Sequence, residues 1–245
     1  MINTIFDNII NTFENNDIKE FFVKKCLPII PDYFWAVPAS SSGLYHSAIS
    51  LGEGGLARHT AALVRLMNYM FEVEALSIQF TSRERDLLRI GGLMHDTRKS
   101  GTQEDYEKNK HTKFTHPLQA AEAIRGLDGL PKDEIELIAH VIESHMGIWN
   151  TSKREPEIVL PVPKDKYQIL VHLCDYIVSR KDVEFKFDDM PTMGEEPPTV
   201  ETWKLTFGKH KGKTLLEVQK EDPSYIYWAK DNVTSEPCKT LVKQL

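Results

Sequence analysis

Hydrophobic residues recur three and four positions apart over most of the chain, which is the spacing of an amphipathic helix. The clearest case is residues 54–76, where Leu56, Leu63 and Met70 share one face with His59. Up to about residue 182, no segment shows convincing strand alternation. We expect further helices in residues 4–13, 81–96, 115–127, 131–149 and 163–182.

Start signals support three of these helices. Thr81 or Ser82 followed by Glu84 has the pattern of a capping box. Thr115 stands in an N-cap position with a proline shortly after it. Pro131 is followed by acidic residues, which favour a first helical turn. The polar, charged residues 101–114 predict a loop.

A change of composition divides the chain. Residues 188–202 contain three prolines and several acids without apolar periodicity, so they predict a linker. In residues 204–215, two short strands are expected around a Gly-Lys turn. The predicted fold is an all-α helical bundle with a small α+β C-terminal module. We divide it into an N-terminal helical segment (1–43), a main domain (44–187), the linker (188–202) and the module (203–245).

Composition narrows the class of protein. The 245 residues are 41% hydrophobic and 27% charged with a net charge of −6, so the chain is no polycation and any nucleic-acid contact requires a local basic patch. Cys26, Cys174 and Cys238 are an odd, widely spaced set, which argues against a disulfide framework and suits a reducing compartment. We see no signal peptide and no membrane-spanning stretch, and expect a cytoplasmic protein.

Histidines are the informative residues. A single histidine on an apolar helix face is more often a hydrogen-bonded core residue than a metal ligand. Six of the nine histidines, however, fall in or at the ends of predicted helices of one domain, and two of those segments also supply an aspartate. The six are His59, His95, His116, His140, His145 and His172.

The side chains of His95 and Asp96 lie about 100° apart around a helix axis and can reach one cation only at the centre of a bundle. Asp175 interrupts an apolar helix, where a buried carboxylate is costly unless it is paired or bound to metal. Together with His59, these residues offer two imidazoles and two carboxylates. This set suits a first-row divalent ion such as Mn²⁺, Fe²⁺, Co²⁺ or Ni²⁺.

The ordered set His59, His95-Asp96 and Asp175 resembles the H…HD…D signature of HD-domain metal-dependent phosphohydrolases. The resemblance spans about residues 44–182. It implies hydrolysis of a phosphoester or phosphoanhydride, in which metal ions activate water and neutralise phosphoryl charge.

Further histidines resemble the H…HD…H…H…D order of binuclear members, especially the HD domain of bacterial 3′-5′ exoribonucleases. The resemblance implies two divalent ions (Mn²⁺, Fe²⁺, Co²⁺, Ni²⁺ or Mg²⁺), with Asp96 as the bridge. The extra ligands are His116, His140 and His145, although His140 can equally be an outer contact, and His172 is better explained as structural. Met146 stands in place of the second histidine of the family's SHHG turn, and we recognise no OB-fold in this sequence.

Three residues near the metal pair are candidates for contact with substrate. Lys99 matches the lysine of HD domains, which implies that it clamps a phosphate. Arg98 either shares that role or satisfies the carbonyls at the end of a helix. His46 either donates to the substrate or is an exposed loop histidine. We assign catalytic roles to Asp96, Lys99 and His46.

Basic and aromatic residues alternate in the C-terminal module, with Lys209 and Lys211 among them. They either bind a phosphate backbone and stack bases or form a solvated hairpin over a small aromatic core. The stretch resembles a module at the C-terminus of exonuclease-like proteins. We expect a hydrolase of nucleotides or single-stranded nucleic-acid ends. The alternatives are a nucleotidase or dNTP triphosphohydrolase and a nucleotide-sensing binding protein, and nothing specifies an oligomeric state.

Overall fold

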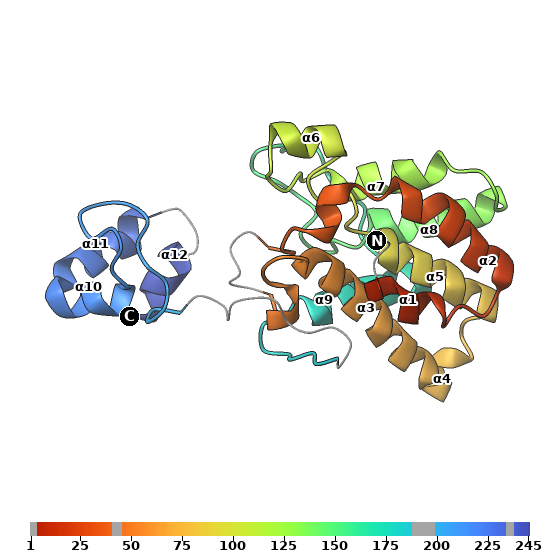
Figure 1. Ribbon diagram of the computed structural model, residues 1–245, viewed down its shortest axis with the longest axis horizontal. Helices are drawn as coiled ribbons and strands as arrows, with labels where there is room; N and C mark the ends of the chain where they lie inside the picture. Colours follow the sequence, from red (N-terminus) through yellow and green to blue (C-terminus); the bar gives the residue numbers. More distant parts are fainter. Residues whose placement is uncertain (1–3, 41–45, 188–198, 234–237) are drawn as a thin grey trace.

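The computed structural model describes residues 4–40, 46–187, 199–233 and 238–245. The described α-helices of the N-terminal segment are α1 (Thr4–Ile10) and α2 (Asn16–Phe21), and those of the main domain are α3 (Gly55–Glu72), α4 (Glu74–Ser77), α5 (Ser82–Met94), α6 (Gln103–Lys108), α7 (His116–Arg125), α8 (Lys132–Glu143) and α9 (Lys166–Val178) (Figure 1). All six helices expected from the apolar spacing are present, as α1, α5, α7, α8 and α9, with the expected helix at 54–76 broken into α3 and α4.

Helix α5 lies at the centre of the bundle, where it packs against α3, α8 and α9. Two glycines make this close packing possible. A Cβ on Gly92 would lie 2.9 Å from both Leu63 Cδ2 and Val64 Cγ2 of α3, and one on Gly91 would lie 2.4 Å from Val141 Cγ2 of α8. Because α5 ends directly after this contact, the residues that follow it are delivered to the interior of the bundle.

The capping box predicted at the start of α5 is confirmed, and a second capping box starts a helix that was not expected. Thr81 and Glu84 form the reciprocal capping box at the start of α5. The predicted loop after α5 contains α6, which begins with a second capping box between Thr102 and Asp105. Helix α6 buries no residue, so its sequence has no apolar face that could have predicted it.

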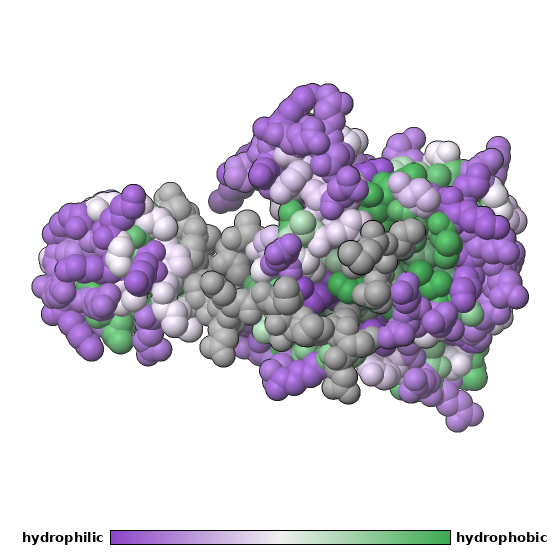
Figure 2. Space-filling model, in the orientation of Figure 1, coloured by the Kyte–Doolittle hydropathy of each residue, from purple (hydrophilic) through white to green (hydrophobic). Residues whose placement is uncertain are grey.

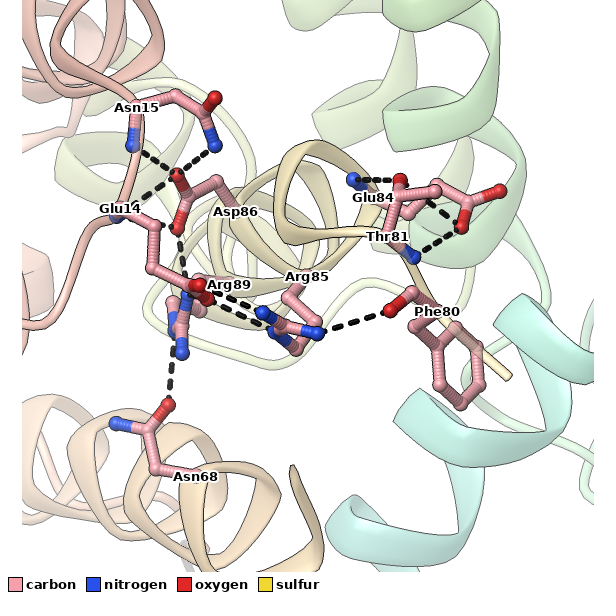
Figure 3. A network of polar contacts seen from close by, with 9 residues as sticks. All are labelled: Glu14, Asn15, Asn68, Phe80, Thr81, Glu84, Arg85, Asp86 and Arg89. Atoms are coloured by element: carbon pink, nitrogen blue, oxygen red, sulfur yellow. Dashed lines mark hydrogen bonds and ion pairs between the residues drawn. The ribbon is translucent and has the colours of Figure 1, made fainter. Parts of the chain in front are cut away.

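The N-terminal segment shares the core of the main domain. Phe6, Phe22 and Phe34 belong to the same buried cluster as the residues of α3, α5 and α8. A polar anchor reinforces this attachment (Figure 3). Asp86 of α5 is fully buried and accepts hydrogen bonds from the backbone amides of Glu14 and Asn15, while Arg89 Nη1 lies 2.5 Å from Asp86 Oδ1.

The C-terminal module has a core of its own, formed with the helices α10 (Leu215–Glu221), α11 (Pro223–Asn232) and α12 (Cys238–Leu241). The two predicted strands are reduced to one isolated bridge between Lys204 and Thr214. Gly208 and Gly212 adopt left-handed backbone angles, with φ of 72° and 89°, and turn the segment before a ladder can extend. For its described residues, the module is therefore helical and not α+β.

On the face that Figure 2 shows, hydrophilic residues predominate and include the region of α6. Charged residues make up 27% of the whole chain, which agrees with a hydrophilic surface. None of the described helices is long and apolar enough to cross a lipid bilayer.

Candidate metal centre

Six predicted site residues from separate elements meet inside the bundle. His59 comes from α3, His95 and Asp96 directly follow α5, and Asp175 comes from α9. Asp175 Oδ1 lies 3.0 Å from His59 Nε2 and 3.8 Å from His95 Nε2. The remaining two members are His116, at the first position of α7, and His145, just beyond α8.

Asp96 is surrounded by nitrogen atoms. Its Oδ1 lies 3.0 Å from His116 Nε2 and 3.5 Å from His145 Nε2. Its Oδ2 lies 2.7 Å from Lys99 Nζ and 3.5 Å from His95 Nε2. Burial by itself would raise the pKa of Asp96, but chiefly the ammonium group of Lys99 holds it well below its usual range, so the carboxylate is ionised.

Backbone carbonyls orient three of these imidazole rings. Each ring places Nδ1 at 2.7 Å from a carbonyl three residues earlier, His95 on Gly92, His116 on Lys113 and His145 on Ile142. A carbonyl oxygen only accepts, so Nδ1 carries the proton and donates it. In the neutral ring, the Nε2 lone pair then points into the cluster, as a metal ligand requires.

Buried polar atoms without a hydrogen-bond partner indicate whether a cation fits in this cluster. His95 Nε2, Asp96 Oδ1 and His116 Nε2 are buried and have no hydrogen-bond partner. Burial lowers the pKa of His116 to about 4, so its ring is neutral at neutral pH. A neutral Nε2 and a carboxylate oxygen are both acceptors, and burying them face to face is costly unless a cation lies between them. The residues present therefore fit a metal ion.

Two sets of potential ligands overlap in the cluster. One comprises His59, His95 and Asp175, and the other comprises His95, Asp96 and His145. In each set, the ligand atoms lie within 4.8 Å of one another. Imidazole nitrogen combined with carboxylate oxygen is a donor set that suits first-row divalent ions. His95 belongs to both sets, and Asp96 additionally faces His116.

The three candidates for substrate contact lie next to the cluster or one turn away from it. Lys99 pairs with Asp96 and keeps 18% of its side chain exposed. The His46 ring is 5.8 Å from the ring of His59, its Nδ1 is buried without a partner, and burial lowers the pKa of His46 to about 3. Arg98 is half-buried, and burial lowers its pKa. It makes no ion pair with any described carboxylate.

His140 does not join the cluster. Its side chain is 55% exposed on the outside of α8 and lies 3.5 Å from Glu136, one helical turn earlier. His145, five positions later, follows the end of the helix and turns inward. The structure therefore corrects the prediction that His140 is a metal ligand of this site.

Two supporting residues hold the ligand-bearing turns. His172 places Nδ1 at 2.7 Å from the carbonyl of His145 and donates to it, in keeping with the structural role expected for His172. The Tyr33 hydroxyl donates to the carbonyl of Gly101 at 2.8 Å and accepts from the amide of Ser100 at 3.1 Å. Tyr33 was not predicted, because no local pattern signals a contact with a turn 67 residues further along the chain.

The two basic residues singled out in the C-terminal module differ in their contacts. Lys209 Nζ lies 2.6 Å from Asp222 Oδ2 and 5.6 Å from the centre of the Tyr225 ring. His210 shares the same carboxylate oxygen at 3.0 Å. Lys211 is exposed and has no carboxylate partner among the described residues.

Comparison with known families agrees with this geometry. Residues 205–234 match the model of the exodeoxyribonuclease X-like C-terminal family. No curated protein and no solved structure matches the chain. The model of the HD domain matches residues 56–179, a span that starts just before His59 and ends just after Asp175. The match covers half of the chain and includes every member of the buried cluster, so the chain belongs to the HD domain family, whose members are generally metal-dependent phosphohydrolases.

Proposed function

We propose that this protein hydrolyses phosphoester bonds of nucleotides or of single-stranded nucleic-acid ends, as a phosphodiesterase similar to a 3′-5′ exonuclease. The observation that supports this most strongly is the buried, ionised Asp96, whose Oδ1 faces the unpartnered Nε2 of the neutral His116 ring at 3.0 Å. Such an arrangement is costly for a purely structural cluster and suits a bound divalent cation.

The ligands in this proposal are the six clustered residues. A divalent cation bound there, such as Mn²⁺, Fe²⁺, Co²⁺, Ni²⁺ or Mg²⁺, supplies Lewis acidity at the phosphoryl group and lowers the pKa of the attacking water. Two overlapping ligand sets, which share His95, support a pair of ions. The ligands are His59, His95, Asp96, His116, His145 and Asp175.

Side chains beside the ligands would hold the substrate. Lys99 already neutralises Asp96 at 2.7 Å, so its ammonium group is placed to bind a phosphoryl oxygen drawn to the same position. Arg98 provides a second cation one residue away. The neutral ring of His46 has an unpartnered nitrogen and would form a hydrogen bond to the substrate.

A cavity next to the cluster gives the substrate room. It has a volume of about 650 Å³, and His116 and Met146 form part of its wall. Ligand pockets of about 300–1,000 Å³ accommodate molecules of nucleotide size. Lys113 and Arg154 also line this cavity, which suits an anionic ligand.

The C-terminal module supports a nucleic-acid or nucleotide substrate through its similarity to the C-terminal family of exodeoxyribonuclease X. Exposed Lys211 would contact a phosphate of such a substrate, with Lys209 beside it. The alternative within hydrolases is a nucleotidase or dNTP triphosphohydrolase that acts on free nucleotides. A nucleotide-sensing binding protein is disfavoured, because a sensor does not need the complete set of ligands that the cluster retains.

One assay tests the proposal and separates these activities. The purified protein with Mn²⁺ is incubated with a 5′-labelled single-stranded RNA, the matching DNA, and the eight common nucleoside triphosphates. Asp96→Ala serves as the inactive variant and His140→Ala as the matched control outside the cluster. A ladder of shortened oligonucleotides that only Asp96→Ala abolishes supports an exonuclease. Loss of triphosphates with intact oligonucleotides supports the alternative, and no change in either substrate class contradicts both.

A further inference from the structure

Two aromatic side chains form a flat, exposed surface at the edge of the helical domain. The rings of Trp149 and Tyr176 are nearly parallel, with an interplanar angle of 17° and centroids 5.8 Å apart. Both remain accessible, with 45% of Trp149 and 39% of Tyr176 exposed. Aromatic rings of this size are normally buried, because they contribute much of the hydrophobic stabilisation of a core. Their exposure as an ordered pair therefore calls for a partner.

A cation lies over both rings. The guanidinium carbon of Arg180 is 4.4 Å from the centre of the Tyr176 ring and 5.6 Å from that of Trp149. Arg180 Nε also donates to the carbonyl of Tyr176 at 3.2 Å, which fixes the side chain along α9. No described carboxylate pairs with Arg180, so its charge is available to an anionic ligand.

This surface is built on the elements that hold the metal cluster. Tyr176 directly follows Asp175 in α9, and Trp149 is four residues beyond His145. The amide of Trp149 donates to the carbonyl of Met146 at 3.1 Å, which keeps it on the turn that carries His145. His172 links the two elements, because it donates to the carbonyl of His145 and its ring lies 6.3 Å from that of Tyr176.

We propose that Trp149, Tyr176 and Arg180 form a base-stacking platform that binds a nucleobase of the substrate beside the metal cluster. This inference rests on the proposed function and specifies its substrate class as one that carries a base. Exposed aromatic faces bind bases of any sequence by stacking, and an arginine next to them adds attraction to the flanking phosphate. A base held there would place its neighbouring phosphate close to the clustered ligands.

The test measures binding separately from hydrolysis. Affinity for a fluorescein-labelled single-stranded oligonucleotide is determined by anisotropy in EDTA, for the wild-type protein and for Trp149→Leu, Trp149→Phe, Tyr176→Leu and Tyr69→Leu. Leucine keeps apolar bulk and removes the aromatic face, while phenylalanine keeps a face. Tyr69 is the matched control, since it is an aromatic residue of α3 with 56% exposure and lies ten residues beyond His59.

The platform predicts a base-dependent loss of affinity. Trp149→Leu and Tyr176→Leu should each weaken oligonucleotide binding by roughly 5- to 150-fold, the range found for loss of one stacked base. Trp149→Phe should retain most of the affinity, and Tyr69→Leu should match the wild type. An oligonucleotide with abasic sites should bind weakly and equally to all five proteins. The same titration with a labelled mononucleotide decides whether one base suffices or whether a strand is needed.

The outcomes separate this inference from the proposed function. If no hydrolysis is found but leucine at position 149 or 176 removes base-dependent binding, the platform stands and the reaction assignment fails. If oligonucleotides are hydrolysed while these variants keep wild-type affinity and KM, the reaction stands and the platform is refuted. The platform is also refuted if Trp149→Leu only abolishes self-association in light scattering, because the surface then contacts a second copy of the chain.

Discussion

Asp96 Oδ1 and His116 Nε2 face each other at 3.0 Å without a proton between them. The His116 ring donates its proton in the opposite direction, to the carbonyl of Lys113. Two acceptors this close repel each other, and a bound cation would offset that repulsion. Metal binding should therefore be coupled to the stability of the fold.

We therefore expect divalent metal to raise the melting temperature. At a free Mn²⁺ concentration 100 times the dissociation constant, linkage adds about 2.7 kcal/mol, which for a domain of this size is a shift of about 5–10 °C. Differential scanning fluorimetry with EDTA and with Mn²⁺ measures it. His116→Ala should show a smaller shift, and equal shifts for both proteins would place the bound metal elsewhere.

A matched pair of histidine variants tests which ring belongs to the site. His145→Ala removes a nitrogen 3.5 Å from Asp96 and should lower metal affinity by more than the 10- to 100-fold that is typical of outer contacts. His140→Ala alters an exposed ring and should leave affinity and activity within about twofold of the wild type, since surface changes are usually small. Isothermal titration with Mn²⁺ compares the two, and a reversed order would contradict the assignment.

Packing around α5 gives a stability prediction. Gly92→Ala would place a methyl group 2.9 Å from Leu63 Cδ2, and such overpacking should cost about 1–3 kcal/mol. Gly126→Ala is the control, because its added Cβ has no neighbour closer than 3.7 Å apart from its chain neighbours and local helix backbone. Urea unfolding measures both variants. Equal stability of Gly92→Ala and the wild type would show that the contact between α3 and α5 is loose.

The anchor of the N-terminal segment should be sensitive to acid. Glu14 accepts hydrogen bonds from Arg85 and Arg89, and chiefly Arg85 lowers its pKa from the ordinary value of 4.5. A lowered folded-state pKa adds stability that is complete above pH 4.5 and is lost as the pH falls through the lowered value.

The difference in unfolding free energy between the wild type and Glu14→Gln should therefore be largest at neutral pH and shrink in acid. Urea titrations of both proteins over a pH series give this difference. A difference that does not change with pH would show that the charge of Glu14 has no part in the anchor.

Much of the candidate metal centre could be predicted because several of its residues stand at regular positions in strongly patterned helices. His59 lies on an apolar face, and Asp175 interrupts one, so both had to point inward. His140 satisfied the same sequence order, yet the end of α8 decides that it faces solvent and His145 faces the cluster. Sequence spacing does not locate the last residue of a helix closely enough to make that distinction.

Features that depend on tertiary contacts could not be predicted. Helix α6 has no apolar face. In the expected hairpin near Lys204, two glycines with left-handed backbone angles turn the chain, so that the two strands do not form. The pairing of Trp149 with Tyr176 joins residues 27 positions apart in sequence, and neither has a local pattern that indicates the other.

The most direct test of the metal centre is an anomalous difference map from crystals soaked in Mn²⁺. The structure predicts density beside Asp96, within coordination distance of Nε2 of His95, His116 or His145 and of the carboxylate oxygens of Asp96 and Asp175. A second peak on the other side of Asp96 would establish a pair of ions. Absence of density at Asp96 in crystals that bind Mn²⁺ elsewhere would contradict the central claim that this buried cluster holds the metal.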